Sequence, residues 1–253
     1  MTETLEEVWA RGGVAFGAWV TAISDTTVEI LARAGYDYVG IDCQHTLLSE
    51  ADAGQLLRPL LAAGIPSVVR VSRNEPAAIG RVLDAGADGV IVPLVDTPEE
   101  AEAAVAARRV PARGVRSFGP VRPSLGFDVE ALERRVSCFV MIESRSAIDN
   151  LDAICATPGL AGVYVGPGDL SISMGTSWLL RPRPAEVTAA IAAVPAACRR
   201  AGVVPGMHAG SGAFAAELAA AGFRLLTLTS DAGLLAGAAG RDLALARAET
   251  GEG

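Results

Sequence analysis

Residues able to bind a metal or to move a proton follow several apolar runs of this sequence. Asp42 and His45 stand in Gly-Ile-Asp-Cys-Gln-His, and Arg70 follows Ile-Pro-Ser-Val-Val. Glu143 and Asp169 come after two later apolar runs. Carboxylate oxygens are the donors that Mg²⁺ and similar ions prefer. Glu143 and Asp169 therefore predict a divalent-metal site that leaves coordination positions open for water and substrate.

The arginine and the histidines suggest how a substrate would be held and deprotonated. Arg70 ends its apolar run, and a guanidinium beside a pocket can hold a carboxylate through two hydrogen bonds. His45 has Asp42 close by to orient its ring, as proton transfer requires. The second histidine, His208, has no such neighbour, and we interpret it as structural or peripheral. Each residue alone also fits a structural role. A carboxylate after a strand, for example, is often the N-cap of the next helix.

The charge and the residue types exclude several classes of function. All 21 positively charged side chains are arginine, and without lysine there is no Schiff-base chemistry, pyridoxal phosphate attachment or P-loop lysine. With a formal net charge of −8 and no basic block, we expect no nucleic-acid or membrane partner. Widely spaced cysteines and the lack of an apolar leader indicate a soluble, cytoplasmic protein with free thiols.

Alternation of two kinds of segment predicts the elements that position these residues. Short β-branched runs alternate with Ala- and Leu-rich stretches of helical period, which predicts an α/β fold, a (β/α)₈ TIM barrel as a single domain over residues 1–253. The predicted strands are Val14–Trp19, Tyr36–Asp42, Ser67–Val71, Gly89–Pro93, Cys138–Glu143, Gly162–Gly166, Val203–Met207 and Arg224–Thr229. The predicted helices are Thr26–Ala34, Glu50–Ala63, Pro76–Ala85, Pro98–Arg108, Ser146–Ala156, Pro184–Arg200, Gly212–Ala221 and Ala232–Ala246. Barrel sites lie at the carboxyl ends of the strands, where the polar residues above would meet.

Three further segments have compositions typical of loops. Pro111–Gly126 is too rich in Gly, Pro and Arg for a helix, and we interpret it as a functional or interface loop whose arginines need carboxylate partners. Gly166-Pro-Gly168 is a poor match to a dinucleotide fingerprint and better suits a close backbone approach to an anion. Gly210-Ser-Gly212 could hold a phosphate.

Taken together, several segments resemble the class II, metal-dependent pyruvate aldolases of the HpcH/HpaI family. They are Gly17-Ala-Trp19, Ala34–His45, Arg70-Val, Leu83–Pro93, Ile142-Glu143-Ser and Val165–Gly175. The resemblance covers nearly the whole chain. It implies reversible aldol cleavage of a 4-hydroxy-2-oxo acid, either a 2-keto-3-deoxy sugar acid or a hydroxy-oxo-dioate, to pyruvate and a small aldehyde. It also implies Mg²⁺, Mn²⁺ or Co²⁺ as cofactor and a homo-oligomer, trimeric or hexameric.

The same resemblance implies a role for individual residues. By position these are Glu143 and Asp169 as metal ligands, His45 with Asp42 and Asp84 for proton transfer, and Arg70, Trp19, Gly168, Asp169 and Ser171 as substrate contacts. Arg70 would clamp pyruvate and its enolate, and Trp19 would shape the aldehyde pocket. The chain departs from the family at Met141, where Gln is usual, at Gln44, where Glu is common, and at Gly168, where Ala is frequent.

Three other functions stay open at this point. The Gly-Ser-Gly segment is compatible with a phosphosugar isomerase or epimerase on a TIM barrel. A lyase of the same superfamily acting on an acyl-CoA thioester would need a basic groove, which the sequence does not reveal. A non-catalytic protein that binds a metal or a keto acid is the third alternative, suggested by Met141.

Overall fold

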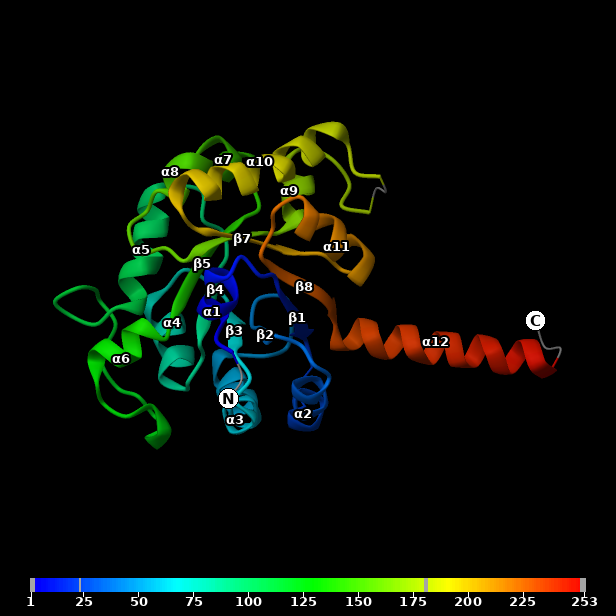
Figure 1. Ribbon diagram of the computed structural model, residues 1–253, viewed down its shortest axis with the longest axis horizontal. Coiled ribbons are helices and arrows are strands. Elements are labelled where there is room, and N and C mark those ends of the chain that lie inside the picture. The colour runs from blue at the N-terminus through cyan, green and yellow to red at the C-terminus, as the bar shows by residue number, and fades with distance from the viewer. Residues whose placement is uncertain (1–2, 23, 180–181, 251–253) are drawn as a thin grey trace.

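The computed structural model describes residues 3–22, 24–179 and 182–250, and its centre is a closed barrel of eight parallel strands. Each strand is hydrogen-bonded to the next, and the last pairs with the first (Figure 1). The strands are β1 (Ala15–Val20), β2 (Tyr38–Asp42), β3 (Ser67–Arg70), β4 (Gly89–Val92), β5 (Ser137–Ile142), β6 (Gly162–Val165), β7 (Val204–His208) and β8 (Leu225–Ser230). The (β/α)₈ prediction is confirmed, and every predicted strand overlaps an observed one.

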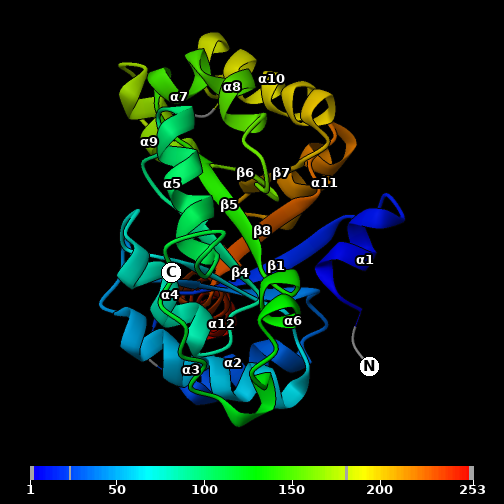
Figure 2. The same ribbon diagram turned by 90° about the vertical axis from the view of Figure 1, so that its left-hand side faces the viewer.

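Helices connect the strands and surround the barrel (Figure 2). They are α1 (Leu5–Ala10), α2 (Asp25–Arg33), α3 (Glu50–Ala63), α4 (Pro76–Asp84), α5 (Pro98–Arg108), α6 (Val129–Arg134), α7 (Arg145–Asp149), α8 (Leu151–Cys155), α9 (Pro167–Ser173), α10 (Ala185–Ala201), α11 (Gly212–Ala220) and α12 (Asp231–Thr250). None of the helices in the described ranges has the length and apolar character needed to span a membrane. The predicted helix Ser146–Ala156 is interrupted at Asn150, which separates α7 from α8. The sequence prediction missed α1, α6 and α9.

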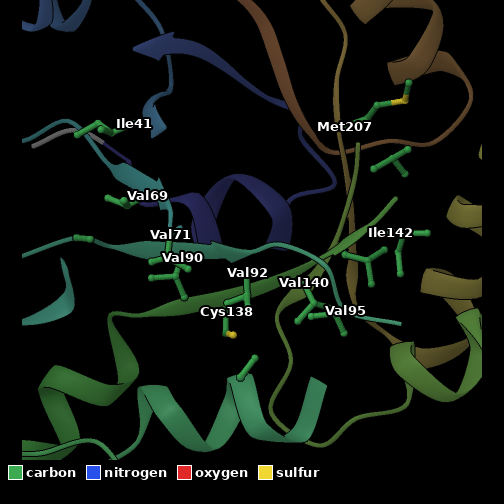
Figure 3. Packing of buried hydrophobic residues seen from close by; sticks show 14 of the residues in the cluster. Ile41, Val69, Val71, Val90, Val92, Val95, Cys138, Val140, Ile142 and Met207 are labelled. Atoms are coloured by element: carbon green, nitrogen blue, oxygen red, sulfur yellow. The ribbon is translucent and has the colours of Figure 1, made fainter. Parts of the chain in front are cut away.

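Apolar side chains fill two separate spaces, one on each face of the strands. Outward-facing residues such as Val90, Val92 and Val140 pack against the surrounding helices (Figure 3). Inward-facing residues form a second cluster inside the barrel, which includes four aromatic side chains, Trp19, Tyr38, Phe139 and Tyr164. This alternation follows from the period of two in a β-strand.

Glycines make room for the aromatic rings inside the barrel. A Cβ on Gly17 would lie 2.2 Å from the ring of Tyr38, and one on Gly40 would lie 2.3 Å from the ring of Trp19. Large and small residues on neighbouring strands therefore interlock, as close packing requires. The ring of Trp19 stays at the carboxyl end of β1 as a result.

The segment Pro111–Gly126 contains no α-helix, as predicted, and only a short 3₁₀ turn at Pro123–Leu125. Its arginines have partners within the same chain, contrary to the reasoning that they need an interface. Arg113 pairs with Glu133, and Arg116 pairs with Asp84. Arg122 donates to backbone carbonyl groups of α3 and the turn after α4. The ion pairs of this loop therefore do not indicate an interface.

Candidate active site

The carboxyl ends of the strands surround a cavity of about 410 Å³ at the mouth of the barrel. Its walls include Trp19, Thr21, Arg70, Met141, Tyr164, Gly166, Gly168, Asp169, Trp178, Arg183, His208, Gly210 and Ser230. Four of the residues to which the family resemblance gives a role, Trp19, Arg70, Gly168 and Asp169, lie in this wall. The cavity occupies the face on which TIM barrels carry their active sites.

Asp42 holds Arg70 in place across the gap between two neighbouring strands. The two residues are direct partners in the register of β2 and β3, and Asp42 accepts from Arg70 Nε at 2.9 Å and from Nη2 at 2.5 Å. Burial alone would raise the pKa of Asp42, but the hydrogen bonds and charge of Arg70 outweigh it and lower the pKa. The pair therefore stays ionised, and its two-point geometry fixes the plane of the guanidinium.

The remaining donors of Arg70 face the cavity. The guanidinium carbon lies 5.5 Å from the ring centroid of Trp19, and Nη1 lies 3.9 Å from the sulfur of Met141. A thioether is a weak acceptor, so this contact leaves the Nη1 hydrogens available to an anion. Met141 thus contacts the arginine without satisfying it.

Glu143 is not itself among the residues that line the cavity; it lies buried directly behind Gly166 and Met141 of the wall, in an environment that suits a cation. Only 3% of the residue is exposed, Oε1 accepts from the Leu94 N–H at 2.7 Å, and Oε2 has no partner among the described residues. Leu94 adopts a φ of 55°, which is uncommon for a leucine and directs its N–H at the carboxylate. Burial is the main cause that raises the pKa of Glu143; the Leu94 N–H opposes it, and the charge of Asp169 adds to it.

Asp169 stands in the first turn of α9, which begins directly after β6. Its side chain is exposed at the cavity wall, close enough to affect the pKa of Glu143. Two carboxylates near enough to interact, one of them with an unpaired buried oxygen, form an unfavourable arrangement unless a cation lies between them. No cluster of three or more His, Cys, Asp or Glu side chains occurs in the described ranges, so these two residues would share an ion with water or substrate.

The proton-transfer residues implied by the resemblance do not come together within one chain. His45 is exposed on the loop after β2, and Asp42 accepts from its backbone N–H at 3.4 Å, with no bond to its ring. Asp84 ends α4, at the turn that leads into β4, and is paired there with Arg116. It therefore lies near the amino ends of the strands, at the opposite end of the barrel from the cavity.

Ser171, a further implied substrate contact, is buried inside α9. Its hydroxyl donates to the Pro167 carbonyl at 2.7 Å, one turn earlier in the helix, and the residue is absent from the cavity wall. In this chain the hydroxyl of Ser171 supports the helix that presents Asp169.

Sequence reasoning missed one aromatic side chain of the cavity and gave one of its histidines no role in binding. Tyr164 stacks on Trp19 with ring centroids 6.3 Å apart, and its hydroxyl lies 2.6 Å from Thr227 Oγ1, which also bonds to Tyr38. His208, which we had interpreted as structural or peripheral, ends β7 and lines the cavity. The alternation of residues along β6 and β7 is the signal that could have placed both side chains inside the barrel.

Comparison with known proteins places this barrel in a family. The model of the HpcH/HpaI aldolase/citrate lyase family matches residues 15–238. The chain therefore belongs to the HpcH/HpaI aldolase/citrate lyase family, as the sequence motifs predicted. A solved structure of a member of that family from Burkholderia cenocepacia is 35% identical and has a TM-score of 0.86 over 94% of this chain and 96% of that one.

Two curated relatives are named as aldolases. The hydroxypyruvate/pyruvate aldolase of Rhizorhabdus wittichii is 38% identical over 244 residues, which cover 95% of this chain and 97% of the relative. The 2-dehydro-3,6-dideoxy-6-sulfogluconate aldolase of Pseudomonas putida is 30% identical over 231 residues, 89% of each chain. The alignments thus extend over nearly the full barrel.

Proposed function

We propose that this protein is a carbon–carbon lyase that reversibly cleaves a 4-hydroxy-2-oxo acid to pyruvate, or a close analogue of pyruvate, and an aldehyde, with the help of a divalent metal ion. The observation that carries the proposal is the mouth of the barrel, where a fixed arginine shares a cavity with Asp169 and the unpaired buried oxygen of Glu143 lies just behind the wall. The family and the aldolase names of the relatives support the same reaction class.

Glu143 and Asp169 would hold the metal, which when bound supplies electrostatic stabilisation for the negative charge that develops on the 2-oxo acid. Mg²⁺ suits this all-oxygen donor set, and Mn²⁺ and Co²⁺ are the alternatives to test. The chain has no lysine with which to form an imine, so its own residues must stabilise the enolate by charge and hydrogen bonds.

Arg70 would bind the 2-oxo acid through the Nη1 hydrogens that Met141 leaves free. Because Asp42 fixes its guanidinium, Arg70 needs little reorganisation as the enolate charge forms. The N–H groups of Gly168 and Asp169, in the first turn of α9, have no acceptor inside that helix and would hold the substrate carboxylate. Trp19 and Tyr164 would exclude water from one side of the substrate.

His45 would accept the proton of the 4-hydroxyl group, directly or through water. Asp84 lies at the other end of its own barrel, so it can act with His45 only from a second copy of the chain. The proposal therefore includes a homo-oligomer, with a trimer or a hexamer as the expected assembly.

The alternative of phosphate binding by Gly210–Gly212 has less support, because Ser211 Oγ caps α11 by accepting from Phe214 N.

A metal-dependence experiment tests the reaction class. We expect chelation to abolish pyruvate release from a 4-hydroxy-2-oxo acid and added Mg²⁺, Mn²⁺ or Co²⁺ to restore it. Borohydride added with pyruvate should leave the protein mass unchanged. Aldol activity that survives exhaustive chelation would contradict the proposal.

Proton exchange tests the role of Arg70 apart from bond cleavage. In deuterated water, without aldehyde, the wild-type protein should exchange the methyl protons of pyruvate. Arg70→Lys keeps the charge but loses the two-point geometry, and we expect a loss of about 10²–10³-fold in both exchange and cleavage, typical of a lost oxyanion contact. Exchange at the wild-type rate would exclude the enolate role of Arg70.

A further inference from the structure

His208 occupies a defined place in the mouth of the barrel that the proposed mechanism does not use. Ile142, Val165 and Met207 are partners in the register of β5, β6 and β7. The residues that follow them, Glu143, Gly166 and His208, therefore stand side by side where these strands end. Gly166 has no side chain, which lets the side chain of Glu143 lean over the end of β6.

The space directly over Gly166 is occupied by neighbouring side chains. A Cβ at this position would lie 2.7 Å from Glu143 Oε2 and 2.7 Å from the terminal methyl of Met141. These two side chains therefore fill the space directly over Gly166, and a substrate held at Arg70 and Asp169 reaches β7 through the cavity beside them. His208 is the polar side chain that it meets there, with Gly210 beyond.

The imidazole of His208 is held by packing and leaves its polar atoms to the cavity. Its ring meets Trp19 edge to face, with centroids 5.9 Å apart and an interplanar angle of 71°. Neither ring nitrogen has a hydrogen-bond partner among the described residues. A polar group fixed by an aromatic contact, with both nitrogens unused, is suited to recognising a bound molecule.

The protonation state of His208 limits what it can recognise. Burial, together with the positive charge of Arg70 and against the opposing charge of Asp42, lowers the pKa of His208 to about 4. At neutral pH the imidazole is uncharged and offers one donor and one acceptor, as a hydroxyl group does. Such a ring is a poor general base near pH 7 and gives an anion no charge attraction, so a hydroxyl is the fitting ligand.

The geometry points to His208 as a specificity-determining residue that hydrogen-bonds to a hydroxyl on carbon 3 of the 2-oxo acid. The chain then favours a 3-hydroxy-2-oxo acid over pyruvate as the nucleophilic partner. This inference rests on the proposed function, because Arg70 and the carboxylate pair must fix carbons 1 and 2 for carbon 3 to point along the cavity toward His208. Nothing in the packing of His208 requires a polar side chain, since a phenylalanine could make the same edge contact with Trp19.

Isotope exchange in deuterated water, with metal but without aldehyde, tests this role. Each turnover removes a proton from carbon 3 and returns a deuteron, so the substrate is otherwise unchanged. The kcat/KM of exchange is measured by proton NMR for hydroxypyruvate and for pyruvate. His208→Phe should lower the value for hydroxypyruvate about tenfold, as expected for one lost hydrogen bond, and change that for pyruvate less than about twofold. His208→Gln, which keeps a donor and an acceptor, should retain part of the preference.

The outcomes separate this inference from the function on which it rests. Exchange of neither substrate by the wild-type protein overturns the proposed function and the inference with it. An active wild type whose ratio of the two kcat/KM values is unchanged in His208→Phe overturns the inference alone. Equal loss on both substrates also overturns it, because His208 would then act on the fold or on a step common to both. Thermal unfolding of each variant checks the fold, and His208→Leu replaces the phenylalanine variant if that one is unstable.

Discussion

Glu143 combines two properties that normally exclude each other, a carboxyl group that is buried and an oxygen without a partner. Leaving such an oxygen unsatisfied costs about 1–3 kcal/mol, more when the group is charged. The unfavourable energy is local to the site, and a bound cation would remove it. The residue is therefore better explained by what it binds than by what it does for the fold.

The first prediction follows from this local energy. Without metal, Glu143→Gln should leave the melting temperature unchanged or higher, because the buried charge is removed. In wild type, Mg²⁺ at about 100 times its Kd should add about 2.7 kcal/mol to the free energy of unfolding, and this gain should vanish in the variant. Glu130→Gln, at an exposed ion pair with Arg134, is the matched control and should keep the gain. An equal metal effect in both variants would remove Glu143 from the site.

His208 gives a prediction about stability and pH. Its folded-state pKa of about 4 lies below the ordinary value of 6.5, so between these values the unfolded chain binds a proton that the folded chain does not. The contribution is complete above about pH 6.5 and is lost as the pH falls toward 4. From pH 7 to pH 5, wild type should lose roughly 1–2 kcal/mol more stability than His208→Gln. His45→Gln, at an exposed ring, is the control in urea titrations and should follow wild type; a parallel fall in all three proteins would contradict this account.

At the scale of elements, α9 shows both what the sequence predicts and what it hides. The strand before it was predicted from its β-branched run, and Asp169 was correctly expected at the carboxyl end of that strand. The helix itself was missed, because Gly-Pro-Gly is typical of a loop, although Pro is favourable in a first helical turn.

Local sequence patterns correctly placed the residues that end strands, including Arg70 and Glu143. They could not give contacts across the barrel, such as Tyr164 on Trp19, or show that Asp84 ends a helix far from the cavity.

Two glycines at the β6–α9 junction allow a matched test of this element. Gly166→Ala would place a methyl group 2.7 Å from Glu143 Oε2, so the carboxylate must move. We expect at least a tenfold loss of metal affinity, measured by calorimetry. Gly168→Ala meets no atom within 4 Å and should keep the affinity, with a gain of roughly 0.5–1 kcal/mol in stability from the helix. Equal affinities in the two variants would show that Gly166 does not set the position of Glu143.

At the scale of the whole molecule, α12 is the feature that a single copy of the chain leaves unexplained. The helix extends away from the barrel (Figure 1), and Asp231, its first residue, is its one buried residue. That carboxylate accepts from the Thr21 and Ala22 N–H groups and so anchors only the start of the helix. Exposed leucines continue along it at Leu234, Leu235, Leu243 and Leu245. In proteins most of the stability of a helix comes from the packing of an apolar face, so we expect a second copy of the chain to cover this 20-residue helix.

The last prediction therefore concerns assembly. Light scattering at micromolar concentration should give a mass that is a multiple of the 25.9 kDa chain. The double variant Leu235→Glu/Leu243→Glu should lower this mass and reduce the circular dichroism signal at 222 nm, because α12 unfolds when its cover is lost. Arg247→Glu changes charge on the same helix without removing an apolar side chain and should leave both signals unchanged. Since Asp84 can reach His45 only from another copy, the leucine variant should also lose aldol cleavage more than proton exchange of the 2-oxo acid, in which water can take the proton while Arg70 and the carboxylate pair of one barrel hold the substrate. A monomeric wild-type protein with an intact α12 would overturn this arrangement and leave His45 to act without Asp84.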